Sequence, residues 1–174
     1  MSKMILGKTG LEVEKNGFGA LPIQRVSKEE AVHLLRKAYD AGINFYDSAH
    51  AYTDSEEKIG LGLSDVRENI VIATKALPTN PADVKAQLEQ SLRMMKTDYI
   101  DVYQLHLCPV CYRPGDEYGL YDTLLEAKEK GLIRHIGMTA HSINVAFEAA
   151  RSGLYETIQF PFSYLSGELE LQLV

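Results

Sequence analysis

The fold is decided by residues 70–105, which read IVIATKALPTNPADVKAQLEQSLRMMKTDYIDVYQL. The stretch opens with the β-branched run Ile70–Thr74, which is typical of a buried strand. Asn80 then caps a helix whose first residue is Pro81, a position where the missing N–H costs no hydrogen bond. A second strand follows at Tyr99–Leu105. This order predicts two parallel strands joined by a helical crossover.

The same unit recurs on both sides of this stretch, so we expect a sheet of six strands. The expected strands are Asn16–Ala20, Ile43–Tyr46, Ile70–Thr74, Tyr99–Leu105, Leu132–Met138 and Thr157–Phe160. The expected helices begin at or directly after Ser27, Ser55, Asn80, Leu120 and Ser142. A hairpin of Met4–Leu6 and Leu11–Val13 precedes the first strand. Ser27 and Glu30 have the spacing of a capping box, in which each side chain satisfies the other residue's backbone N–H.

Two architectures fit this alternation, an open doubly wound sheet and a closed barrel. The open sheet is usually marked by a G-x-G-x-x-G turn after its first strand, but residues 17–22 read GFGALP and lack the third glycine. The missing glycine weakens the open-sheet interpretation, and on these residues alone a parallel α/β barrel and an open sheet both stay open. A complete barrel typically needs about 250 residues. For a barrel, the 174 residues therefore predict a single domain, 1–174, that is incomplete and truncated after its sixth strand.

The composition excludes several classes of partner. The chain has 18 Lys and Arg against 24 Asp and Glu, a net charge of -6, and no basic block to bind nucleic-acid phosphates. It contains no apolar run of about 18 residues that would predict a membrane span, and Met1–Gly10 does not look like a signal peptide. Its two cysteines fit a reducing compartment. We expect a cytoplasmic protein without nucleic-acid or membrane partners.

Polar side chains stand at the carboxyl ends of successive expected strands. They are Asp47, Lys75, His106, Thr139 and His141, with Gln159 inside the last strand. A single polar residue at a strand end is usually just solvated. A series on neighbouring parallel strands converges on one edge, where α/β barrels build their active sites. The series therefore predicts a functional site at the mouth of the barrel.

Tyr52 completes this group chemically. A free tyrosine has a pKa of about 10, which is high for a proton donor at neutral pH. A lysine ammonium beside it favours the phenolate and lowers that pKa. Asp47, Lys75 and Tyr52 therefore make a sensible proton-donor chain, and His106 is suited to orienting the same substrate oxygen. The plain alternative is a surface tyrosine, one of 10 in the chain, and a solvated lysine.

Several motifs, in this order and with the right helices between them, closely resemble the aldo-keto reductases. They are residues 6–13 (LGKTGLEV), 17–19 (GFG), 44–52 (NFYDSAHAY), 71–75 (VIATK), 98–106 (DYIDVYQLH) and 131–137 (GLIRHIG). The resemblance covers the chain from about Met4 to Phe162. It implies a barrel of the triosephosphate-isomerase type and NAD(P)H-dependent reduction of an aldehyde or ketone, with a small carbonyl compound as substrate.

The resemblance also implies roles for individual residues. The family's proton-donor tyrosine falls on Tyr52, supported by Asp47, Lys75 and His106. Hydride would pass from the nicotinamide of NADP(H) or NAD(H) to the carbonyl carbon while Tyr52 protonates the oxygen.

The cofactor contacts that the resemblance implies fall on Gly19, Ala20, Asp47, Thr139 and Gln159. Thr139 stands where the family has serine and keeps the hydroxyl. The next position is alanine where asparagine is usual, and the histidine that follows it is a candidate replacement. The run 139–142 (TAHS) looks most like bacterial and archaeal members that carry a C-terminal iron–sulfur segment.

A different class of function stays open beside the enzyme. A barrel fragment with unpaired first and sixth strands would expose sheet edges, which favour association. The alternative is thus a non-catalytic chain that folds or acts only with itself, as a homo-oligomer, or with a partner chain. The sequence leaves open the carbonyl substrate, the choice of NADH or NADPH, the oligomeric state and whether the truncated chain binds cofactor.

Two further pairs have plain interpretations. Cys108 and Cys111 form a C-x-x-C pair that suits a redox dithiol or half of a metal site, but an ordinary loop with two free thiols is favoured and no metal site is predicted. Glu56 and Glu57 lie in the first turn of an expected helix, where acidic groups favour the helix dipole. We interpret them as cap charges rather than a catalytic dyad.

Overall fold

The computed structural model describes residues 2–174 and has a six-stranded parallel sheet as its main element. The strands are β3 (Phe18–Gly19), β4 (Phe45–Asp47), β5 (Val71–Ala76), β6 (Ile100–Leu105), β7 (Ile133–Thr139) and β8 (Thr157–Gln159). Each strand pairs in parallel with the next one along the chain. Because the order of these six strands never reverses, residues 2–174 contain no switch point of the kind that defines a doubly wound sheet. The sheet is six strands of a barrel wall, which confirms the predicted incomplete α/β barrel.

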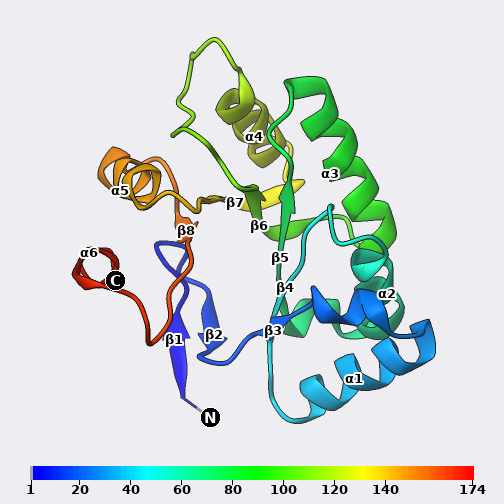
Figure 1. The fold of residues 1–174 in the computed structure, drawn as a ribbon. Coiled ribbons are helices and arrows are strands. Elements are labelled where there is room, and N and C mark those ends of the chain that lie inside the picture. The colour runs from blue at the N-terminus through cyan, green and yellow to red at the C-terminus, as the bar shows by residue number, and fades with distance from the viewer. Residues whose placement is uncertain (1) are drawn as a thin grey trace.

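Helices connect the strands. They are α1 (Lys28–Asp40), α2 (Ser55–Leu63), α3 (Pro81–Met95), α4 (Leu120–Glu129) and α5 (Ile143–Ser152), with the short helices η1 (Pro22–Arg25) and η2 (Ser64–Asn69). A further short helix, α6 (Glu168–Leu171), follows β8. Figure 1 shows α1 to α5 in an arc around the strands. Within residues 2–174, none of the helices has the length and apolarity needed to cross a bilayer.

Side-chain caps mark the starts of two helices at the residues that the sequence predicts. The Asn80 side chain accepts a hydrogen bond from the N–H of Asp83 at 3.0 Å, which caps α3 directly before Pro81. The Ser27 hydroxyl accepts from the N–H of Glu30 at 3.1 Å, as one half of the expected capping box. The expected strands are also found, but the first is shorter than predicted, with only Phe18–Gly19 paired.

The N-terminal hairpin pairs β1 (Lys3–Ile5) with β2 (Glu12–Glu14) in antiparallel fashion, as expected. Its turn packs on the segment that leads into β8, where the N–H of Lys8 donates to the carbonyl of Glu156 at 2.8 Å. Gly7 has a φ of +53° at this contact, and a Cβ there would lie 2.3 Å from the Glu156 oxygen. Only glycine fits this approach, so the hairpin is fixed beside β8 (Figure 1).

The central strands are buried on both faces. All six residues of β5 and all six of β6 are buried, because helices cover the outer face and the curled sheet encloses the inner one. A cavity of about 150 Å³ remains on the inner side. It is lined by Leu6, Phe45, Asp47, Ala73, Val102, Gln104, Thr157, Ile158 and Gln159.

An ion-pair network closes the amino ends of the central strands. Asp101 is 1% exposed, and its carboxylate accepts from Arg67 Nη2 at 2.7 Å and from the N–H of Ile72 at 2.9 Å. Arg134 Nη1 donates to the other oxygen of the carboxylate at 3.0 Å. The two guanidinium groups lie 4.0 and 3.7 Å from the centroid of the Tyr99 ring. This network joins η2, β5, β6 and β7 at the end of the sheet opposite Lys75.

The substitution Asp101→Asn is expected to destabilise the fold strongly. It preserves the volume of the side chain but leaves the buried Arg67 guanidinium without a counter-charge, which costs about 3–5 kcal/mol when a buried pair is broken. Urea unfolding followed by circular dichroism measures the loss. The matched control is Glu126→Gln, which breaks the half-exposed Lys85–Glu126 pair and should leave the midpoint unchanged. Equal losses in both variants would contradict this account.

Candidate active site

Parallel pairing brings the ends of three neighbouring strands to one edge. Asp47 is the last residue of β4, Lys75 is the second-last residue of β5, and His106 directly follows β6. In register, Asp47 stands beside Ala73 and Lys75 beside Gln104. Tyr52 comes from the turn between β4 and α2. The four predicted catalytic residues therefore share one end of the sheet.

A buried ion pair joins the first two of these residues. Lys75 is 2% exposed, and its Nζ donates to Asp47 Oδ2 at 2.7 Å and to the carbonyl oxygen of Ser48. The Gln104 amide lies 3.5 Å from the other Asp47 oxygen. Burial lowers the pKa of Lys75, and the Asp47 carboxylate opposes that shift. The pair fixes the ammonium group at the edge of the sheet.

Tyr52 lies beside both Lys75 and His106. The Lys75 Nζ is 5.4 Å from the centroid of the tyrosine ring, and the rings of Tyr52 and His106 meet edge to face with centroids 5.9 Å apart. Burial raises the pKa of Tyr52, and the Asp47 carboxylate raises it further. The net shift is therefore opposite to the expected lowering by Lys75, because burial and the Asp47 carboxylate both disfavour the phenolate and outweigh the ammonium. The phenol stays protonated at neutral pH.

His106 is a neutral imidazole in this environment. Burial lowers the pKa of His106 to about 4, and the nearby Lys75 and His141 add to the shift. Its Nδ1 atom is buried and has no hydrogen-bond partner within residues 2–174. A neutral imidazole has one nitrogen that donates and one that accepts. His106 is thus suited to hydrogen bonding with an uncharged ligand oxygen.

A cavity of about 230 Å³ opens over these groups. It is lined by Tyr52, Lys75, His106, Leu107, Thr139, His141, Gln159, Phe160 and Pro161. Six of the lining side chains are polar or ionisable, and the other three form an apolar rim. Asp47 lines the inner cavity instead and is joined to this one through its ion pair with Lys75. The structure therefore brings together most of the residues that the sequence selected.

Thr139 shapes the wall of this cavity. Its hydroxyl accepts from the N–H of Leu107 at 2.8 Å, and its carbonyl accepts from the N–H of Cys108 at 2.7 Å. The hydroxyl proton remains available for donation. These bonds hold Leu107 at a φ of 54°, a conformation that is rare for a branched residue. No sequence signal identified Leu107 as a site residue, since neither its type nor its position suggests a left-handed conformation.

The other predicted cofactor residues stand outside the cavity lining. Gly19 is exposed, and nothing lies within 4 Å of the position a Cβ would take. Ala20 is fully buried, with its N–H bonded to the carbonyl of Asp47 and its own carbonyl accepting from Ser55. Both groups of Ala20 are therefore committed to the fold. Contacts of Gly19 and Ala20 with a cofactor stay predictions.

The cysteine pair packs in the core. Cys108 and Cys111 are both buried and unpaired, and burial raises the pKa of Cys108 to about 12. A thiol this hard to ionise is a poor nucleophile and a poor metal ligand. Across residues 2–174, no three His, Cys, Asp or Glu side chains gather in a way that could hold a metal ion.

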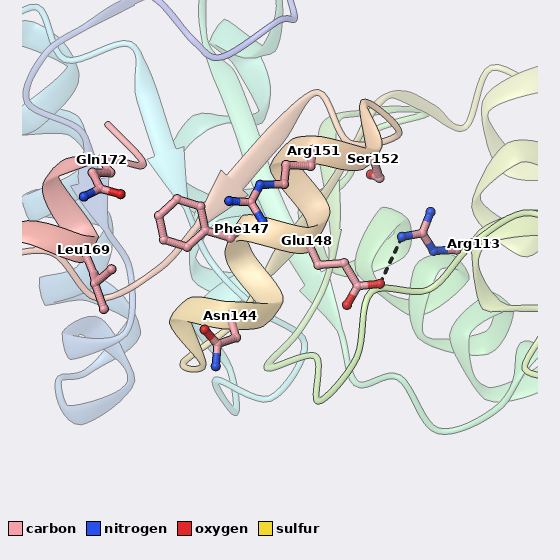
Figure 2. A pocket seen from close by; sticks show the side chains of 8 residues that line it. All are labelled: Arg113, Asn144, Phe147, Glu148, Arg151, Ser152, Leu169 and Gln172. Carbon is pink, nitrogen blue, oxygen red and sulfur yellow. Dashed lines mark hydrogen bonds and ion pairs between the residues drawn. The ribbon is translucent and has the colours of Figure 1, made fainter.

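A larger cavity, with a volume of about 580 Å³, lies elsewhere, between α5 and α6 (Figure 2). It is lined by Arg113, Asn144, Phe147, Glu148, Arg151, Ser152, Leu169 and Gln172. Its principal polar feature is an exposed ion pair between Arg113 and Glu148 at 3.0 Å (Figure 2). The smaller cavity over Tyr52 is the better candidate for chemistry, because Lys75 and His106 are buried there and burial lowers the pKa of both, that of His106 to about 4.

The fold and the site together define a barrel-type α/β protein with a tyrosine, lysine and histidine grouped at the carboxyl ends of its strands. The profile described as "Aldo/keto reductase family" matches residues 3–168, and the chain belongs to this family. The family is one of oxidoreductase enzymes, in agreement with the sequence motifs.

Similar proteins agree with this assignment. An uncharacterized oxidoreductase, YqkF, from Bacillus subtilis is 29% identical over 94% of this chain and 56% of its own length. Human aldo-keto reductase family 1 member C2 is 35% identical over 71% of this chain and 46% of its own length. The solved aldo-keto reductase AKR11C1 from Bacillus halodurans, in its holo form, is 28% identical with a TM-score of 0.85, covering 98% of this chain and 61% of that one. The chain spans about half the length of the curated relatives it matches.

The shifted pKa of His106 predicts a pH dependence of stability. The unfolded chain takes up a proton on this imidazole near pH 6.5, whereas the folded chain does so only near 4. Between these values the unfolded state binds more protons, so His106 makes stability fall as the pH is lowered from 6.5 towards 4. In His106→Gln, the decline of the urea midpoint between these pH values should be shallower. His33→Gln, at an exposed position on α1, is the control, and equal slopes for all three proteins would refute the prediction.

Proposed function

We propose that this chain carries the catalytic residues of an NAD(P)H-dependent aldo-keto reductase that reduces an aldehyde or ketone to an alcohol, with Tyr52 as the proton donor. The observation that carries the proposal is the common cavity of Tyr52, Lys75 and His106, with Lys75 held by Asp47 at 2.7 Å. Family membership supports the reaction class, and the lining supports small carbonyl compounds as substrates.

The residues around the cavity fit the nicotinamide end of such a cofactor. The Thr139 hydroxyl already accepts a hydrogen bond from Leu107, so its proton is free for a carboxamide oxygen. The Gln159 side chain lines the same cavity and can meet the same carboxamide. A volume of about 230 Å³ suits a head group rather than a whole dinucleotide, since sites for larger ligands usually reach about 300–1,000 Å³. Thr139 and Gln159 are therefore proposed to hold the nicotinamide.

The protonation states of the site fit carbonyl reduction. A bound nicotinamide supplies the hydride for the carbonyl carbon. Tyr52 Oη, which carries its proton at neutral pH, gives that proton to the carbonyl oxygen. His106, which is uncharged at neutral pH, donates a hydrogen bond to the same carbonyl oxygen and orients the carbonyl group. The phenolate that Tyr52 then becomes lies beside the Lys75 ammonium, which stabilises the new negative charge.

The substitution Tyr52→Phe is expected to lower carbonyl reduction by about a hundredfold or more, because it removes the general acid and leaves the ring in place. Oxidation of NADPH and of NADH with a model aldehyde, followed by absorbance, measures the rate and shows which cofactor is preferred. Fluorescence titration should show cofactor affinity unchanged. Tyr118→Phe, at an exposed tyrosine outside the cavity, is the control. Full turnover in Tyr52→Phe would rule out the proton-donor role.

A second reading, in which the chain acts only in association with another copy of itself, is favoured by one observation. Strands β3 and β8 form the two edges of the sheet, and several apolar side chains after β8 are exposed. They are Phe162, Tyr164, Leu165, Leu169, Leu171 and Val174. Exposed sheet edges and apolar surface of this kind favour protein contacts.

Size-exclusion chromatography with light scattering separates the two readings. A monomer that binds and oxidises NADPH supports the enzyme as a single chain. A dimer that binds no cofactor supports the association reading. Replacing Leu165 and Leu171 by Ser should dissociate such a dimer, whereas Leu61→Ser, at an exposed position on α2, should leave it intact.

A further inference from the structure

Glu56 and Glu57 are neighbours in the first turn of α2, but the structure separates them completely. Glu57 is partly exposed and pairs with Lys28 on α1 at 2.5 Å, as a surface cap charge would. Glu56 is 5% exposed. The interpretation of both residues as cap charges therefore holds only for Glu57. A buried carboxylate is costly unless its neighbours compensate it, so its contacts identify what it does.

The first contact of Glu56 is with β5. Its Oε1 accepts a hydrogen bond from the Thr74 hydroxyl at 2.6 Å. Thr74 directly precedes Lys75, and successive residues of a strand point to opposite faces. Glu56 therefore holds β5 from the helix side, while Lys75 reaches the cavity from the other side.

The second contact is with the turn that carries Tyr52. Oε2 of Glu56 lies 3.9 Å from Nδ1 of His50, a buried nitrogen with no hydrogen-bond partner within the described chain. The backbone N–H of His50 donates to the carbonyl of Lys75 at 2.9 Å. His50 and Glu56 thus flank Tyr52 in sequence, and each is attached to β5 at adjacent residues.

The turn between them needs such an anchor. Thr53, directly after Tyr52, has a φ of 44°, a conformation that persists only where the surroundings impose it. The hydrogen bonds from the N–H of Tyr52 to Ala49 and from the N–H of Ser55 to Tyr52, both 2.9 Å, are local to the turn. They do not attach the turn to the sheet. The contacts of His50 and Glu56 attach it to β5, and the Ser55 hydroxyl attaches it to the carbonyl of Ala20 at 3.0 Å.

We propose that Glu56 is a positioning residue that holds the turn carrying Tyr52 against β5, through Thr74 on the strand and His50 on the turn. This inference rests on the proposed function, in which Tyr52 must stand beside Lys75. The carboxylate touches neither the cavity nor a ligand. It acts on the reaction only by fixing where the phenol lies.

The test compares Glu56→Ala, Glu56→Gln and the control Glu57→Ala in the full chain. Glu56→Ala removes the hydrogen bond to Thr74 and the carboxylate beside His50, and should lower kcat by about a hundredfold, the cost of misplacing a reacting group by roughly 1 Å. The KM for the aldehyde and the Kd for the cofactor should stay within about twofold of the original values, because the lining of the cavity is intact. Glu56→Gln keeps the acceptor for Thr74 and should restore kcat to within about threefold of the original. Glu57→Ala should match the original protein.

Hydrogen exchange supplies a readout that needs no activity. In Glu56→Ala the amides of His50, Tyr52 and Ser55 should exchange about tenfold faster, while those of β6 stay unchanged. If no variant reduces a carbonyl but exchange in this turn rises, the proposed function fails and the positioning role stands. Unchanged exchange in Glu56→Ala overturns the inference, as does a Glu56→Gln variant as impaired as Glu56→Ala.

Discussion

Strands β5 and β6 are buried along their whole length, and this constraint governs how every polar group in the centre of the molecule is used. A polar side chain on a strand covered on both faces must find a partner or reach an end of the sheet. Asp101 meets Arg67 and Arg134 at the amino ends, and Lys75 meets Asp47 at the carboxyl ends. One end thereby becomes a stabilising network and the other the proposed active site.

The ion pair at the carboxyl end sets the protonation of its neighbours. Because Asp47 balances the charge of Lys75, burial has the largest effect on the pKa of Tyr52, and the phenol stays protonated. His106 loses its proton because it is buried and lies near a cation. In one cavity, the protonated phenol is an acid and the neutral imidazole is a hydrogen-bond donor for an uncharged carbonyl. The proposed reaction requires both groups.

Much of this arrangement could be predicted from short segments of the sequence. The strand–helix alternation, the cap at Asn80, the turn glycine at position 7 and the polar residues at strand ends could all be recognised without coordinates. These features depend on periodicity and on residues with special backbone or hydrogen-bonding properties. The parallel order then follows, because short crossovers place successive strands side by side. The grouping of Tyr52, Lys75 and His106 is a consequence of that order.

What the sequence did not determine is burial and its electrostatic effect. Glu56 and Glu57 are the same residue type in the same helical turn, yet one faces β5 and the other faces Lys28, because successive helical residues differ in direction by about 100°. The direction of the Tyr52 pKa shift likewise depended on how deeply the ring is buried and on what already neutralises Lys75. Sequence by itself determined which residues lie at strand ends and in helical turns. Only the tertiary structure decided which of them are covered by other segments, and burial is what turns a carboxylate into an anchor and raises the pKa of a phenol.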